Sequence, residues 1–215
     1  MASRSPARPK LSQSGGLTER RDGDALSLPT PDWLRHDLYV SGPTAAVENF
    51  QKAAAGAGAI PWVYPDLALE EEDRMHALLR PPDGSPGLSL HGARTLARLL
   101  RNASEIHQAR VVAAVGQSRA CPFDLHALVP VPDHVLGLGP DDPTSRVWLR
   151  QHWGTTRALR HVVLHTTKSD RRLRRSAKLH YSFFAADWTP WAAFPKIRAR
   201  WPNLVFAVRP DYRRD

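Results

Sequence analysis

The fold is decided by the segment 148–191, which begins Trp148-Leu149-Arg150-Gln151-His152-Trp153-Gly154 and ends Asp187-Trp188-Thr189-Pro190-Trp191. This segment contains four of the seven tryptophans of the chain. An indole carries a large apolar surface and one N–H that requires a partner when buried, so tryptophans at this density predict a hydrophobic core. Between the two ends, residues 158–165 and 177–185 are predicted to form two strands of a hairpin that is joined by an arginine-rich turn.

Residues on both sides of this segment are predicted to add strands and helices to the same sheet. From Trp33 to Val40 the chain alternates apolar and polar residues, which is typical of a strand with one buried face. Pro43 suits the first turn of a helix that ends near residue 56. Residues 123–132 are interpreted as a short strand ended by two prolines. A helix is predicted to begin at Thr189 and Pro190, followed by a last strand over 204–208.

Residues 57–120 are predicted to form a largely helical insertion in this domain. Prolines between 61 and 86 limit the first part to loop with at most a short helix around 69–79. Ser89 can cap a clearer second helix, whose apolar stripe is Leu96, Leu99, Leu100 and Ala103. Residues 1–32 are polar and have no repeating apolar face, which predicts a disordered tail ahead of one domain over 33–215.

The composition is that of an ordinary globular chain: among its 215 residues, 42% are hydrophobic and 24% are charged. No apolar run approaches the roughly 20 residues that cross a bilayer. Residues 1–24 lack the apolar stretch of a secretory signal. The single Cys121 fits a reducing compartment. A cytoplasmic location with no membrane partner and no cofactor is therefore the expectation.

The charge is distributed unevenly along the chain. The net charge is +9, and +8 of it falls in residues 161–215. Such an asymmetry favours a polyanionic partner, DNA or RNA above all, through neutralisation of phosphates. The alternative is that a codon bias places arginine on any solvated surface, because only five of the 30 basic residues are lysine.

Five short motifs occur in an order that resembles a known family. They are Leu38-Tyr39-Val40-Ser41-Gly42-Pro43; Phe123-Asp124-Leu125 with 128–132; Trp153-Gly154-Thr155; Phe184 with Ala186-Asp187-Trp188-Thr189-Pro190; and 202–206 with Tyr212. In this order the chain resembles the YubB-type ferredoxin-like domain family of bacterial, often plasmid-borne proteins. The resemblance covers about half of the chain, and Thr156-Arg157 departs from the Lys-Trp of the family. It implies an α+β sandwich of βαββαβ type with an antiparallel sheet, and no catalytic residue.

The arginine-rich turn is the best candidate for a functional site. Guanidinium groups match phosphate geometry, and Tyr181 is expected to offer a ring on which a base can stack. Stacking aromatics on the two central strands of an RNA-recognition sheet are not evident from the sequence, so the predicted contacts are mainly to the nucleic-acid backbone. The tentative nucleic-acid-binding residues are Lys168, Arg171, Arg172, Arg174, Arg175, Lys178 and Tyr181. The expected role of Trp148, Trp153, Gly154, Asp187, Trp188 and Pro190 is structural.

Other chemistry is weaker on sequence grounds. His161, His165 and His180 can share one side of a hairpin, but no cysteine or carboxylate is spaced with them, so no metal site is predicted. Cys121 with His126 has the residue types of a nucleophile and base, yet a lone cysteine before an apolar run is more often a core residue. Asp187 is expected to accept a hydrogen bond from the first turn of the following helix or from Trp153.

The prediction is therefore a non-enzymatic binding module of a bacterial mobile element. The alternative is a module that docks another protein through the 57–120 insertion. An enzyme is third, because it needs a cleft that collects Cys121, His126 or Asp187.

Overall fold

A computed structural model describes residues 31–64, 66–165 and 176–211 of the chain. At its centre is a four-stranded antiparallel sheet in the order β2-β3-β1-β4. The strands are β1 (Trp33–Pro43), β2 (Arg160–His165), β3 (Ser176–Ala186) and β4 (Val205–Asp211). The two long central strands pair over their whole length, from Trp33 opposite Ala186 to Pro43 opposite Ser176. The predicted α+β class with an antiparallel sheet is confirmed.

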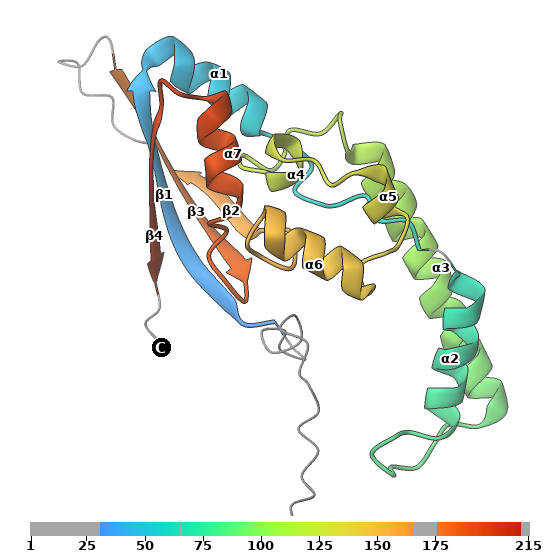
Figure 1. The fold of residues 1–215 in the computed structure, drawn as a ribbon. Coiled ribbons are helices and arrows are strands. Elements are labelled where there is room, and N and C mark those ends of the chain that lie inside the picture. The colour runs from blue at the N-terminus through green and yellow to red at the C-terminus, as the bar shows by residue number, and fades with distance from the viewer. Residues whose placement is uncertain (1–30, 65, 166–175, 212–215) are drawn as a thin grey trace, which may run out of the picture.

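Within the described ranges the chain forms seven helices. Figure 1 shows α1, α4, α6 and α7 on one side of the sheet, whereas α2 and α3 extend away from it as a two-helix arm. No helix in these ranges has both the length and the apolar character needed to cross a membrane. The helices are α1 (Thr44–Ala54), α2 (Leu67–Leu79), α3 (Leu90–Ala114), α4 (Leu125–Leu128), α5 (Asp133–Leu136), α6 (Pro143–His152) and α7 (Ala193–Arg200).

The hydrophobic core lies between the sheet and the helices on that side. Leu38 of β1, Tyr181 of β3 and Phe206 of β4 alternate with half-buried or exposed neighbours, because successive side chains of a strand point to opposite faces. Phe50 of α1 packs its ring edge-on against Phe206, with the centroids 5.2 Å apart. Trp153 is fully buried, and its Nε1 donates to the Val129 carbonyl at 2.8 Å.

The prediction that all four tryptophans of the 148–191 segment enter the core is wrong. Trp153 is buried and Trp148 packs partly against the core, but Trp188 is 48% exposed and Trp191 is 51% exposed. Strand β3 ends at Ala186, and Asp187 follows with φ 65° in the left-handed region. After this turn the chain buries Thr189 and Pro190 instead of the two indoles.

Two predicted elements also differ in the structure. Residues 123–132 contain α4 rather than a strand, because the Asp124 carboxylate caps a helical turn by accepting from the His126 N–H at 2.8 Å. A short apolar run fits either element by periodicity, so the capping residue decides. Helix α7 begins at Ala193, three residues beyond Pro190, since Trp191 and Ala192 form a turn first.

The residues with expected structural roles connect α6 to the end of β3. Gly154 has φ 86°, and a Cβ there would lie 2.9 Å from the Trp191 nitrogen. The Thr155 hydroxyl donates to the Ala186 carbonyl at 2.8 Å. The Asp187 carboxylate accepts from the Asp32 N–H at 3.2 Å and from the Thr156 hydroxyl at 2.5 Å. The expected partners of Asp187, the first turn of α7 or Trp153, are therefore wrong.

The arm, which comprises α2, α3 and the turn between them, is joined to the rest of the chain through a narrow base. Gly56 and Cys121 form a backbone bridge with both hydrogen bonds at 2.9 Å. The predicted cap of α3 is confirmed, since Ser89 Oγ accepts from the Gly92 N–H at 3.2 Å.

The buried side of α3 is not the predicted apolar stripe. Only Ala93 and Ala97 are buried among its described residues, whereas Leu96 is 38% exposed and Leu99 is 60% exposed. Small residues thus allow α2 to pack closely, and the larger leucines face outward.

Candidate nucleic-acid interface

The predicted basic site lies mostly outside the part of the chain that the structure describes. Lys168, Arg171, Arg172, Arg174 and Arg175 fall in the segment 166–175, which lies outside the described residues. Lys178 is described and is exposed on β3.

Tyr181 does not offer a stacking surface, so this part of the prediction is wrong. Its side chain is 0% exposed, and its ring centroid lies 5.4 Å from that of Phe123 in the core. The alternation of β3 turns residue 181 toward the helices, whereas residues 180 and 182 point to the opposite face. Burial raises the pKa of the Tyr181 hydroxyl.

The opposite side of the sheet, here called the open face, carries a row of stacked rings. The strand register places Tyr39 of β1 opposite His180 of β3, and His180 opposite His165 of β2. The Tyr39 and His180 rings stack with centroids 4.4 Å apart and planes 13° apart. His180 and His165 stack at the same distance, with planes 26° apart. Three rings from three neighbouring strands are therefore stacked face to face in one row across the open face.

Two cations lie over the first ring of this row. Lys178 Nζ is 4.8 Å from the Tyr39 ring centroid, and Arg209 Cζ of β4 is 5.2 Å from it. Both positions are within the range of a cation–π interaction. Aromatic rings that can contact bases, combined with cations that can contact phosphates, are components of surfaces that bind single-stranded nucleic acid.

The sequence contained a signal for this surface, but only in part. Tyr39 alternates with buried Leu38 and Val40, so its outward direction follows from the pattern of β1. That His180 lies beside it follows from the register of β1 and β3, which the pattern of one strand does not give. Tyr39 is thus an aromatic residue of a central strand on the open face, which was not evident from the sequence.

One carboxylate belongs to the same surface. His180 Nε2 and Asp37 Oδ1 are hydrogen bonded at 2.6 Å, and His165 Nε2 lies 2.7 Å from Ser182 Oγ. Ligand atoms of Asp37, His165 and His180 all lie within 4.8 Å of one another. These are residue types that bind transition metals, but Nε2 of each histidine is already hydrogen bonded and two cations lie over the neighbouring Tyr39 ring.

His161, which the sequence placed with His165 and His180, does not join this group. Its ring instead meets Phe184 edge-on at 5.9 Å.

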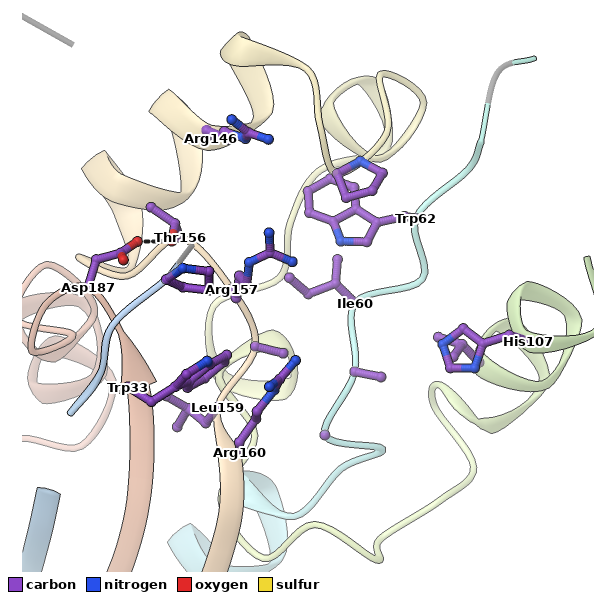
Figure 2. Close-up of a pocket in the computed structure, with 16 residues that line it drawn as sticks. Trp33, Ile60, Trp62, His107, Arg146, Thr156, Arg157, Leu159, Arg160 and Asp187 are labelled. Atoms are coloured by element: carbon purple, nitrogen blue, oxygen red, sulfur yellow. Dashed lines mark hydrogen bonds between the residues drawn. The ribbon is translucent and has the colours of Figure 1, made fainter. Parts of the chain in front are cut away.

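A cavity of about 460 Å³ lies at the end of the sheet where β1 begins. It is lined by Trp33, by residues 58–62, by the α6–β2 connection and by part of α3. Figure 2 shows Arg157 and Arg160 extending from that connection toward the side formed by Ile60 and Trp62. Arg160 Cζ also lies 4.1 Å from the Trp33 ring centroid. The cavity therefore combines guanidinium groups with indole surfaces.

The residues of the enzyme hypothesis are not collected in this cavity. Asp187 lines it, but neither Cys121 nor His126 does. Burial raises the pKa of the Cys121 thiol to about 11, and Sγ donates to the Phe123 carbonyl at 3.3 Å. Nδ1 of His126 accepts from the Val131 N–H at 3.2 Å, so that nitrogen already has a partner. Because a nucleophilic cysteine needs a lowered pKa, this arrangement does not support cysteine catalysis.

Comparisons with known proteins give little further information. No family model matches the chain, and no curated protein matches it. Among solved structures, the chain is similar to the crystal structure of protein api92 from Yersinia pseudotuberculosis, assigned to family DUF1281, with 11% sequence identity and a TM-score of 0.45. The match covers 85% of this chain and 90% of that one.

Proposed function

We propose that this chain binds single-stranded DNA or RNA on the open face of its sheet and performs no reaction on it. The observation that carries the proposal is the stacked row of Tyr39, His180 and His165 with Lys178 and Arg209 over its first ring. The bases of an unpaired strand are exposed and can contact the outward edges of these rings, and a base–aromatic contact contributes roughly 1–3 kcal/mol per base. A duplex hides its bases, so a single strand is the better ligand.

The charge of the chain supports the same ligand. Lys178 lies three residues after the segment that contains Arg171, Arg172, Arg174 and Arg175. In the sequence these arginines precede Lys178, whose Nζ lies over the Tyr39 ring of the stacked row. In this proposal the rings bind bases, and the cations neutralise phosphates, which makes the affinity depend on salt.

The proposal includes the ferredoxin-like fold. The strand order β2-β3-β1-β4 supports it, as does the order of elements β1, α1, β2, β3, α7 and β4 when the residues between α1 and β2 are counted as additions. Membership in the YubB-type family and an origin in a mobile element stay predictions that rest on the sequence motifs.

The test is fluorescence anisotropy with a labelled 12-nucleotide single strand of mixed sequence, roughly the site size of one small binding domain. The strand and the matching duplex are titrated with the unmodified protein and with Tyr39→Ala. We expect the single strand to bind more tightly than the duplex. The substitution is expected to weaken single-strand binding by about 5-fold or more, since it removes one aromatic contact and the ring over which Lys178 and Arg209 lie.

Trp191→Ala is the matched control. It also removes an exposed aromatic ring, but this ring contacts Phe194 of α7 and lies off the open face. Equal affinities of Tyr39→Ala and Trp191→Ala for the single strand would contradict the proposal. So would a duplex that binds as tightly as the single strand.

A second candidate function is favoured by the arm. Leu96, Leu99 and Ile106 recur at helical spacing along α3, and all three are exposed, by 38%, 60% and 54%. Large apolar side chains in one exposed stripe mark a surface that another chain covers.

The charges of α2 and α3 indicate which kind of chain covers this stripe. Helix α2 contains four carboxylates and one arginine, whereas α3 contains four arginines and one carboxylate. An arm with one acidic and one basic helix can be complementary to a copy of itself, because a two-fold axis that brings α2 of one copy to α3 of the other makes this contact twice. We propose a second copy of this chain as the partner.

A further inference from the structure

The cavity beside Arg157 and Arg160 is continuous with the open face. Arg160 lies opposite Phe184 in the strand register, and Phe184 lies opposite Arg35, so Arg160 belongs to a row of the open face and also lines the cavity. Trp33 also belongs to the open face and lines the cavity, since it lies two residues before Arg35 on β1. The six residue steps from Trp33 to Tyr39 span about 20 Å along the strand. A strand of nucleic acid on the open face can therefore reach the cavity.

We propose that this cavity binds the terminal phosphate of the single strand whose bases lie on the open face. The proposal rests on the proposed function and adds to it a requirement for a chain end. A terminal phosphate monoester carries about −1.5 to −2 charge at neutral pH, more than a phosphodiester inside the strand. Guanidinium groups bind such an oxyanion through paired N–H donors, so the cavity prefers the end of a strand to its middle.

The charges in the cavity are available for this role. Neither Arg157 nor Arg160 forms an ion pair with a carboxylate within the described ranges, whereas Arg146 is paired with Asp141 at 3.0 Å. Asp187 is the carboxylate of the lining, and its two oxygens accept from the Asp32 N–H and the Thr156 hydroxyl. Figure 2 shows the Asp187 side chain turned toward Thr156, to which it is hydrogen bonded.

The rest of the lining suits the last nucleotide of the strand. The volume of about 460 Å³ lies within the range of sites for small ligands. Trp33 and Trp62 contribute apolar ring surface on two sides of it, and an indole is a good surface for a base. The cavity can therefore hold a base and a phosphate together.

The experiment compares three forms of the same internally labelled 12-nucleotide strand, which carry a 5′-phosphate, a 3′-phosphate or hydroxyl groups at both ends. Affinities are measured for the full chain and for Arg157→Gln, because Arg157 is exposed and is not part of the sheet. One phosphorylated form is expected to bind about 10-fold more tightly than the hydroxyl form, the effect of one charged hydrogen-bonding contact. Arg157→Gln should remove this preference, so that the phosphorylated form binds the variant no more tightly than the hydroxyl form does.

Arg94→Gln is the control, since it removes the same charge near the start of α3, on the arm. If the three forms bind the full chain equally while Tyr39→Ala still weakens binding, the cavity proposal is overturned and the open-face proposal stands. A terminal preference that persists in Arg157→Gln places the phosphate elsewhere and also overturns it. Absence of binding by all three forms overturns both proposals.

Discussion

His36 is a polar side chain in the core, and its surroundings couple folding to pH. It is 0% exposed, its ring stacks on Phe183 with centroids 5.2 Å apart, and Nε2 lies 2.9 Å from the Thr189 hydroxyl. Nδ1 has no hydrogen-bond partner among the described residues. Burial lowers the pKa of His36, and the Leu34 backbone and the Asp37 charge oppose this effect only in part.

The expected result is a loss of stability in acid. The unfolded chain binds the His36 proton with a pKa of about 6.5, whereas the folded chain binds it only at lower pH. The free energy of unfolding therefore falls as the pH drops from about 6.5 toward the lowered pKa, and His36 adds no pH dependence above that range. Urea unfolding at pH 7 and pH 5 measures the fall, which should be smaller in His36→Gln.

The exposed His134 gives the control, and His134→Gln should keep the pH dependence of the unmodified chain. Burial also lowers the pKa of His126, so His36→Gln retains part of the fall. An identical fall in His36→Gln and in the unmodified protein would show that His36 is not its source.

Gly154 is the second residue whose substitution gives a clear expectation. An alanine there would place its Cβ 2.9 Å from the Trp191 nitrogen and 3.0 Å from the Ala192 nitrogen, at φ 86°. Strain of this kind costs about 1–3 kcal/mol, so Gly154→Ala should lower the free energy of unfolding by that amount. Gly84→Ala separates the strain of a positive φ from that of the close contact. Gly84 also has a positive φ, 74°, but its Cβ would meet nothing within 4 Å. Equal losses in both variants would rule out the contact with Trp191 and Ala192.

At the scale of elements, the sequence predicts strands better than it predicts which strands lie side by side. The alternation of β1 correctly places Leu38 and Val40 in the core. The stacked row depends in addition on the pairing of Tyr39 with His180 and of His180 with His165. A shift of one residue in either register would send His180 to the core side or separate the rings, and alternation within one strand carries no information about such a shift.

Prediction of the helices from the sequence has the same limit. The beginning of α3 follows from its cap, but the side that is buried does not follow from its periodicity. Ala93 and Ala97 face α2, although the larger leucines predict the opposite side. Close packing against another helix favours small residues, and hydrophobicity alone does not reveal it.

Strand β4 gives a prediction for the salt dependence of binding. Arg209 lies over the Tyr39 ring and is placed to contact a phosphate of a nucleic-acid strand bound on the open face. Its replacement in Arg209→Gln should reduce the slope of log K against log salt concentration by about 1. The slope is measured by anisotropy titrations from low to moderate salt. Arg94→Gln on the arm should leave the slope unchanged, and an unchanged slope in Arg209→Gln would exclude it from the interface.

At the scale of the whole molecule, the arm determines the expected oligomeric state. If the outward stripe of α3 is covered by a second copy, the chain is a dimer in solution, and light scattering coupled to size exclusion should report twice the mass of 24.0 kDa. The double substitution Leu99→Glu and Ile106→Glu should give the monomer, because it places carboxylates in an apolar contact. Its helix content by circular dichroism should match that of the unmodified chain if both side chains face outward. An unmodified chain that elutes as a monomer at micromolar concentration would contradict the proposal that a second copy covers the stripe.

The arm and the open face lie on different sides of the body (Figure 1), so neither surface obstructs the other. A pair of molecules held by their arms would thus be bivalent, with two sheets turned outward. Such a pair would engage two stretches of one polynucleotide with an avidity set by the spacing between the sheets rather than by any additional contact. Monomeric variants would then lose apparent affinity for long polynucleotides and keep their affinity for short ones.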